Sequence, residues 1–133
     1  TGIQEQAAVV IGASGGIGAA LARRLEASGP FAVVHALSRS GTGFDLKDEA
    51  SIAAAAASIA EGPAPTLVFV ASGVLHHGFE PERSCAALVA EHLLRDYRIN
   101  AVGPALVAKH FLPLLPRDRR AVFTALSARV GSI

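Results

Sequence analysis

The sequence has few cysteines, little net charge and no long apolar run, and each of these absences excludes a class of protein. Its 133 residues include one cysteine, Cys85, so the chain can form no internal disulfide and no paired-cysteine metal or redox motif. The formal net charge of +1 excludes the strongly basic surface that nucleic-acid binding requires. Apolar runs are too short or too interrupted to span a bilayer, and no signal peptide is visible. We therefore expect a cytoplasmic protein with neither nucleic-acid nor membrane partners.

Apolar residues, in contrast, are plentiful. Hydrophobic residues make up 51% of the chain and charged residues 17%, a composition that excludes a disordered protein. The length is enough for one domain with a buried core, and neither a composition break nor an internal repeat divides it. We expect a single domain over residues 1–133, incomplete at its C-terminal end. The lack of methionine fits a trimmed start, and removal of an initiator before Thr1 explains it equally well.

Short apolar runs, typical of buried strands, alternate with segments of helical spacing. The expected strands are residues 7–11, 31–37, a very short 43–46, 66–71 and 121–126. The expected helices are residues 16–28, 48–61 and 81–112. Strands that are apolar throughout and separated by helices indicate a parallel sheet covered on both faces. The sequence thus predicts an α/β fold with a doubly wound, Rossmann-like parallel sheet and five visible strands.

A glycine cluster between the first strand and the first helix is the most informative segment. Glycines there allow a tight turn and close approach of a ligand, and a helix N-terminus attracts phosphate. The spacing differs from G-x-G-x-x-G, and it is not a P-loop because no lysine follows. The segment predicts a pyrophosphate site, with a purely structural turn as the alternative. The candidate contacts are Gly12, Ser14, Gly15, Gly16, Ile17 and Gly18.

The end of the second expected strand bears on the choice of cofactor. A site for NAD usually carries an acid there that binds the ribose 2′-hydroxyl, about 20 residues after the glycines. This chain has Ser38 and Arg39 instead, with no acid before Asp45. Arginine can pair with a 2′-phosphate through two hydrogen bonds, so the sequence favours NADP(H) over NAD(H). The alternative is a loop arginine that faces solvent.

The spacing of Gly12, Gly16 and Gly18 resembles the cofactor motif of the short-chain dehydrogenases/reductases, and further segments match that family in order. Asp45, followed by Leu46, resembles the acid that binds the adenine amino group. Val70-Ala71-Ser72-Gly73 stands where the family has Asn-Asn-Ala-Gly beneath the cofactor, although only the last glycine is identical. The resemblance therefore makes Ala71, Ser72 and Gly73 candidate cofactor contacts. Residues 98–104 resemble a helix segment whose asparagine, here Asn100, helps hold a proton-relay water and the active-site lysine. Residues 111–115 resemble the end of that helix.

Residues 122–127 resemble the strand that leads to the family's catalytic serine. Ser127 is the candidate, although Ala128 follows where the family often has a second serine. Ser132 is the alternative, and Ser127 ending the strand without a catalytic role is a third interpretation. The family's Tyr-x-x-x-Lys pair is not found in these residues, because the single tyrosine, Tyr97, is followed four positions later by Ala101 and lies before Asn100. Residues 1–133 alone are therefore expected to be inactive, with the C-terminal strands of the sheet missing.

The resemblance implies an oxidoreductase that transfers a hydride between a nicotinamide cofactor and a small carbonyl or alcohol substrate. It also implies a homodimer or homotetramer, because the family's long fourth helix helps to form dimers. No metal is expected, since His76 and His77 have no third ligand at suitable spacing. The alternatives are a non-catalytic dinucleotide-binding sensor or interaction module, and a nucleotide-sugar epimerase, a family that shares the glycine pattern.

Overall fold

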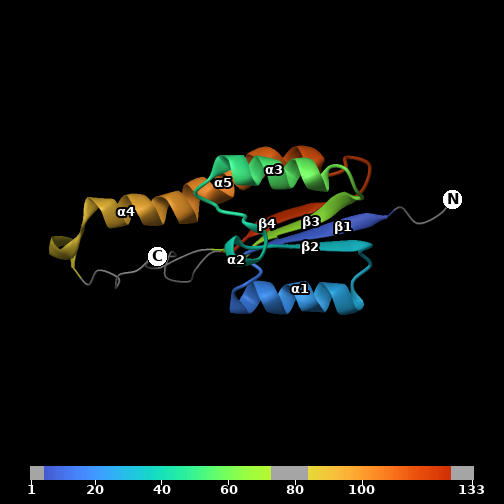
Figure 1. The fold of residues 1–133 in the computed structure, drawn as a ribbon, viewed down its shortest axis with the longest axis horizontal. Helices are drawn as coiled ribbons and strands as arrows, with labels where there is room; N and C mark the ends of the chain where they lie inside the picture. Colours follow the sequence, from blue (N-terminus) through green and yellow to red (C-terminus); the bar gives the residue numbers. More distant parts are fainter. Residues whose placement is uncertain (1–4, 73–83, 127–133) are drawn as a thin grey trace.

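A computed structural model describes residues 5–72 and 84–126 of the chain. Its centre is a sheet in the order β2-β1-β3-β4, in which every neighbouring pair of strands is parallel. The non-sequential order requires crossovers through helices, which lie on both faces of the sheet (Figure 1). The predicted α/β, doubly wound fold is confirmed. The strands are β1 (Gln6–Ile11), β2 (Val33–Leu37), β3 (Ala64–Val70) and β4 (Val122–Ala125).

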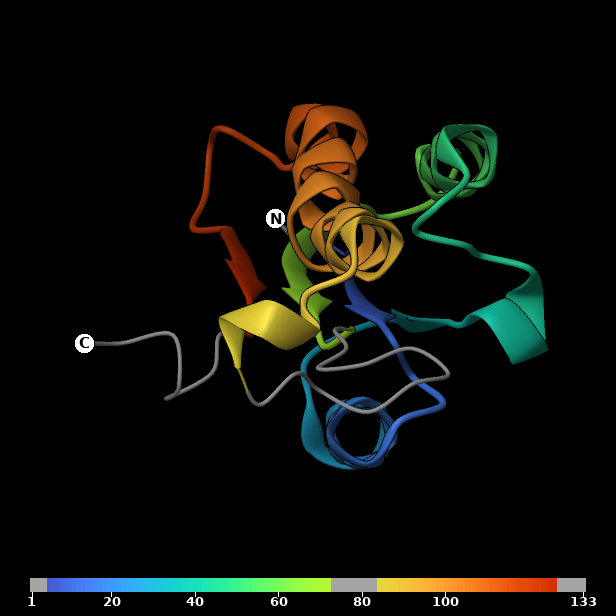
Figure 2. The same cartoon turned by 90° about the vertical axis from the view of Figure 1, so that its left-hand side faces the viewer.

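The helices form two layers around the sheet (Figure 2). Helix α1 (Gly16–Ser28) covers one face, while α3 (Glu49–Ile59) and α5 (Gly103–Phe111) cover the other. Helix α4 (Ala90–Tyr97) leads into α5 and extends past the carboxyl ends of the strands. The short segments are α2 (Arg39–Thr42), the 3-10 turns η1 (Cys85–Ala87) and η3 (Leu112–Leu114), and the π-turn η2 (Arg98–Val102).

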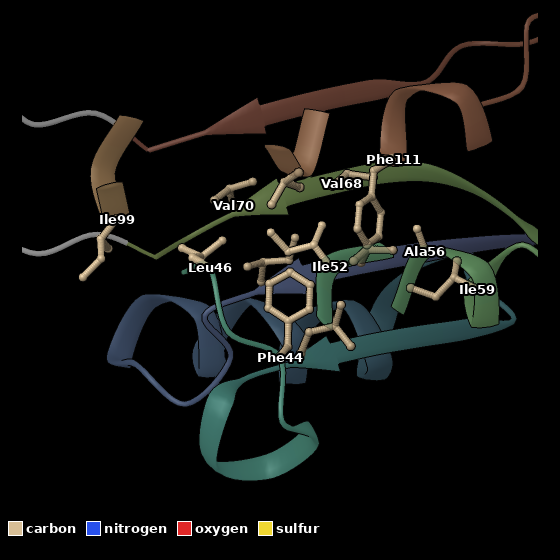
Figure 3. Close-up of a cluster of buried hydrophobic side chains, with 13 residues drawn as sticks. Phe44, Leu46, Ile52, Ala56, Ile59, Val68, Val70, Ile99 and Phe111 are labelled. Carbon is tan, nitrogen blue, oxygen red and sulfur yellow. The ribbon is translucent and has the colours of Figure 1, made fainter. Parts of the chain in front are cut away.

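The core lies between the sheet and the layer of α3 and α5 (Figure 3). Strand β1 has neighbours on both sides and helices on both faces, so Ala7 to Ile11 have no exposed surface. Val107 and Phe111 of α5 are also fully buried against this side of the sheet. Burial of apolar side chains is the main favourable contribution to folding, and here it fixes the carboxyl ends of β1, β2 and β3 side by side.

One cluster of charges joins α3 to α5. The Glu49 carboxylate accepts hydrogen bonds from Lys109 Nζ at 2.6 Å and pairs with His110 Nε2 at 2.8 Å. These hydrogen bonds hold the pKa of the Glu49 carboxyl below its usual value. Glu49 is in the first turn of its helix and Lys109 is in the last turn of its own, so both of these charges also suit the helix dipole.

Two sequence-based expectations were wrong. Residues 43–46 do not form a strand, so the described sheet has four strands and not five. Gly43 turns the chain with a φ of 75°, and Phe44 N–H donates to Ser38 O instead of to a neighbouring strand. Phe44 and Leu46 are apolar because both are buried in the core. Two apolar residues separated by one polar residue form the same sequence pattern as a half-buried strand.

The long helix expected from residue 81 is the second error. Within residues 84–111, helix begins only at Ala90, after the 3-10 turn η1, and the π-turn η2 separates α4 from α5. Pro104 occupies the first turn of α5, where its missing N–H costs no hydrogen bond, so it allows the helical path to continue. Residues 81–83 lie outside the described part of the chain.

Candidate cofactor site

An open pocket lies at the carboxyl edge of the sheet, where ligands of doubly wound folds bind. Its volume is about 350 Å³, which lies within the range of small-molecule sites. Four segments surround it: the loop after β1, the chain from the end of β2 to Lys47, the end of β3, and η2. Its lining residues are Gly12, Ser14, Gly15, Ser38, Arg39, Ser40, Phe44, Asp45, Leu46, Lys47, Ala71, Ser72 and Ile99.

Gly12 makes the turn after β1. Its φ of 89° disfavours any residue with a side chain, and a Cβ there would lie 2.6 Å from Ser72 Oγ and 2.9 Å from Ser72 N. The N–H groups of Gly12 and Ala13 both donate to Leu37 O, at 2.9 and 3.1 Å. The turn is therefore held between the ends of β2 and β3, with its backbone against the pocket.

The N-terminus of α1 follows directly. Gly15 caps the helix without a side-chain hydrogen bond, and the first turn carries no acid. The first N–H groups of a helix have no partner within the helix and attract anions. A Cβ at Gly18 would collide with Gly12 O, so this glycine lets the helix start close to the turn. Gly16 has open space around it, and Ile17 is 62% exposed.

Ser38 and Arg39 differ in what they offer a ligand. Ser38 Oγ accepts a hydrogen bond from Gly41 N–H at 3.0 Å and so caps the short α2. The Arg39 side chain is exposed beside the pocket. Among the described residues, no acid lies within ion-pair distance of it. Its guanidinium group is therefore available to an anionic ligand.

Asp45 is held by the hydrogen bonds of its own loop. Its Oδ1 accepts from Lys47 N–H at 2.9 Å, and its N–H donates to Ser51 Oγ at 2.9 Å. Ser51 lies in the first turn of α3, so the helix anchors the loop. The carboxylate is thus oriented at the rim of the pocket, in a position to accept a hydrogen bond from a ligand.

The end of β3 and the π-turn complete the site. Ala71 N–H donates to Ile11 O at 2.7 Å, which holds the chain after β3 against β1. Asn100 lies in the middle of η2, next to Ile99, which lines the pocket. Asn100 itself is exposed and does not line the pocket. π-turns occur often at functional sites.

The structure thus gathers most of the predicted cofactor contacts around one pocket. Gly16, Ile17 and Gly18 follow it in the first turn of α1 without lining it. Gly73, Ser127 and Ser132 lie outside the described residues, so their predicted roles stay predictions. Sequence reasoning missed four lining residues, and only adjacency to Arg39, Asp45 or Asn100 could have indicated them. They are Ser40, Phe44, Lys47 and Ile99.

Residues 5–72 and 84–126 contain no group of three or more His, Cys, Asp or Glu side chains that could hold a metal ion. Among the same residues, no helix has the length and apolar character needed to cross a membrane.

Solved structures share this arrangement. A small-chain dehydrogenase superposes with a TM-score of 0.81 at 27% identity, covering 98% of this chain and 63% of its own. Another, in complex with NADPH, gives a TM-score of 0.77 at 28% identity and covers 94% of this chain and 52% of its own. The resemblance to the short-chain dehydrogenases/reductases is confirmed. The chain spans only about half to two thirds of the length of these short-chain dehydrogenases.

Neither a protein-family model nor a curated protein sequence matches the chain. A structure described as a ribose-5-phosphate isomerase from Brucella melitensis 16M also superposes, with a TM-score of 0.76 at 26% identity. It covers 97% of this chain and 54% of its own. The short-chain fold by itself therefore leaves the reaction open, and the function must be argued from the site.

Proposed function

We propose that this chain forms the cofactor-binding part of an NADP(H)-dependent oxidoreductase acting on a small carbonyl or alcohol substrate. One observation carries the proposal: the open N-terminus of α1, Arg39 and Asp45 border the same pocket region at the carboxyl edge of the sheet. A positive helix end, a cation and an oriented carboxylate are the three groups that a phosphorylated adenine dinucleotide needs. The small-chain dehydrogenase described with NADPH supports the same choice of cofactor.

The residues fit the parts of NADP(H) as follows. The turn at Gly12 and the first turn of α1 would hold the pyrophosphate, because the first backbone N–H groups of the helix lack partners within it. Arg39, with Ser40 beside it, would hold the 2′-phosphate. The Asp45 carboxylate would accept a hydrogen bond from the adenine amino group. Ala71 and Ser72 would support the nicotinamide end from the end of β3.

The bound cofactor would supply or accept the hydride. Asn100 is proposed to hold a water for proton transfer, and Ser127 to donate a hydrogen bond that orients the substrate oxygen. Residues 1–133 contain no Tyr-x-x-x-Lys pair, and Tyr97 is 64% exposed on α4. General acid–base catalysis contributes about 10²–10⁴-fold. We therefore expect these residues to bind the cofactor without appreciable turnover.

The test is a titration of the purified chain with NADPH and with NADH by isothermal calorimetry. NADPH is expected to bind at least about tenfold more tightly, because a charge-assisted pair to the 2′-phosphate contributes about 1.5 kcal/mol or more. Equal affinity for both would contradict the NADP(H) preference. Binding of neither would contradict the proposed function. The cytoplasmic location and the homodimer or homotetramer stay predictions.

A further inference from the structure

Two segments far apart in sequence meet beside the pocket: the loop of residues 44–47, here called the adenine loop, and the π-turn η2. Arg98 Nη2 donates a hydrogen bond to Lys47 O at 2.9 Å, across 51 positions of sequence. Lys47 lines the pocket, and its N–H is bound to Asp45 Oδ1. The guanidinium group therefore reaches the adenine loop two residues from its carboxylate.

Apolar packing joins the same two segments. Ile99 of η2 is 8% exposed, belongs to the core cluster and lines the pocket. Gly103, directly after η2, approaches Leu46 so closely that a Cβ on the glycine would lie 3.0 Å from Leu46 Cβ. Figure 3 shows Leu46 and Ile99 at the same end of the cluster, toward the carboxyl ends of the strands. A displacement of the adenine loop would therefore disturb η2.

Arg98 also provides the backbone acceptor of the hydrogen bond that defines the π-turn. Its carbonyl oxygen accepts from Gly103 N–H, the five-residue step that defines the turn, and Asn100 lies inside that step. The backbone of Arg98 thus closes the turn while its side chain holds the adenine loop. The side chain is exposed. Its removal would break this link without opening a cavity in the core.

We infer that Arg98 is a positioning residue that couples occupation of the adenine loop to the geometry of Asn100. The inference rests on the proposed function, because it needs an adenine nucleotide at Asp45. A ligand that holds the adenine loop also holds Lys47 O, and Arg98 then fixes the start of the turn that carries Asn100. Coupling of this kind is reciprocal: what fixes η2 also favours nucleotide binding.

The experiment compares Arg98→Met with Arg117→Met in ¹⁵N-labelled protein. Arg117 is an exposed arginine before β4, at the opposite edge of the sheet, so its variant makes the same charge change away from the pocket. The probe is adenosine 2′,5′-bisphosphate, which lacks the nicotinamide and cannot touch the substrate side. In the wild-type chain, saturation is expected to shift the Asp45 backbone amide and the Asn100 side-chain amide together.

In Arg98→Met, the probe at saturation is expected to shift Asp45 as before and Asn100 at least about threefold less. Its affinity is expected to fall about fivefold, which corresponds to roughly 1 kcal/mol. Arg98→Lys keeps a cationic donor and is expected to restore part of the Asn100 shift. Amide exchange at residues 98–103 should be faster in unliganded Arg98→Met than in Arg117→Met, because the turn has lost its external support.

The outcomes are separable. An undiminished Asn100 shift in Arg98→Met would overturn the coupling while leaving the proposed function intact. An equal effect of Arg117→Met would overturn it as well, because net charge and not the hydrogen bond would be the cause. A wild-type chain that does not bind the probe would overturn both the proposed function and the coupling built on it.

Discussion

The pocket has two sides that are built in different ways. The glycine turn, residues 12–18, offers backbone: Gly12 has a φ of 89°, and the helix cap has no side-chain hydrogen bond. The adenosine side, residues 38–47, offers the side chains of Arg39 and Asp45. The backbone that carries them is held by hydrogen bonds from Gly41 N–H to Ser38 Oγ, from Lys47 N–H to Asp45 Oδ1 and from Asp45 N–H to Ser51 Oγ. On the first side the absence of a side chain is the functional property. On the second side, the functional property is the chemical identity of the side chain.

This difference predicts how each side responds to substitution. A side chain added at Gly12 would meet Ser72 and would have to adopt a backbone conformation that it disfavours, so fold and binding should fail together. A side chain exchanged on the adenosine side leaves the backbone in place, so ligand preference can change while stability stays the same. Three predictions test this contrast, and a fourth concerns the strand that leads to the adenosine side. They follow in order of decreasing effect.

Gly12→Ala is expected to have the largest effect. The backbone conformation alone costs about 1–3 kcal/mol for a residue with a side chain, and the new Cβ would also meet Ser72. We expect a clear loss of unfolding free energy in a urea titration and loss of all nucleotide binding.

Gly16→Ala is the matched control for Gly12→Ala, because a Cβ at Gly16 has nothing within 4 Å. Its unfolding free energy should change by less than about 1 kcal/mol, as expected for alanine in place of glycine in a helix. Similar destabilisation by both substitutions would contradict the claim that the turn, and not the glycine content, is critical.

Arg39→Met is expected to change preference without changing stability. Loss of a charge-assisted pair to the 2′-phosphate should weaken NADPH binding by about 10–100-fold, while NADH binding and the melting temperature stay the same. Calorimetric titration with both cofactors measures this, with Arg117→Met as the control for charge. An equal loss for NADH would show that Arg39 does not contact the 2′-phosphate.

Asp45→Asn is expected to weaken NADPH and NADH binding alike, by about three- to tenfold, because both carry the same adenine. The amide oxygen of asparagine can still accept from Lys47 N–H, so the loop should keep its shape. Competition titrations with adenosine 2′,5′-bisphosphate measure the effect at the adenosine end alone. A loss confined to one of the two cofactors would exclude a contact with adenine.

The smallest effect concerns His35 of β2, the strand that leads to Ser38 and Arg39. Its Nε2 is buried without a hydrogen-bond partner among the described residues, and burial lowers the pKa of its imidazole below 6.5. The unfolded chain therefore binds a proton at a higher pH than the folded chain does. Stability should fall as the pH drops through 6.5 toward the folded-state pKa, and the effect of His35 should disappear only well above 6.5.

Urea titrations of the wild type and His35→Gln at pH 7.5 and 5.5 measure this effect. The wild type should lose more stability than the variant between the two pH values. Equal losses would assign the pH dependence to other groups.

Much of the fold could be read from local patterns in the sequence. The helix at residues 16–28 was predicted with the same bounds as α1, because glycines precede it and its apolar spacing is regular. The predicted strand at 43–46 failed because burial of Phe44 and Leu46 imitates strand alternation. The helix expected from residue 81 failed because helical spacing shows neither a late start at Ala90 nor a π-turn.

The candidate site could be predicted where chemistry depends on residue type. Glycine spacing indicated the turn at Gly12, and the missing acid after β2 drew attention to Arg39. Ile99 and Lys47 could not be found in this way. Ile99 lines the pocket only because η2 packs there, and its residue type does not indicate this position. Lys47 accepts the hydrogen bond from Arg98 through its backbone oxygen, a group that every residue has.

The order of strands and helices, the glycine turn and the types of charge offered to a cofactor are already visible in the amino-acid sequence, because these features depend on neighbours along the chain. Two features appear only in the folded molecule: the described sheet has four strands, and Arg98 reaches Lys47 across 51 positions. Such contacts depend on which segments the core brings together. Burial of apolar side chains selects that arrangement from many that local patterns allow equally.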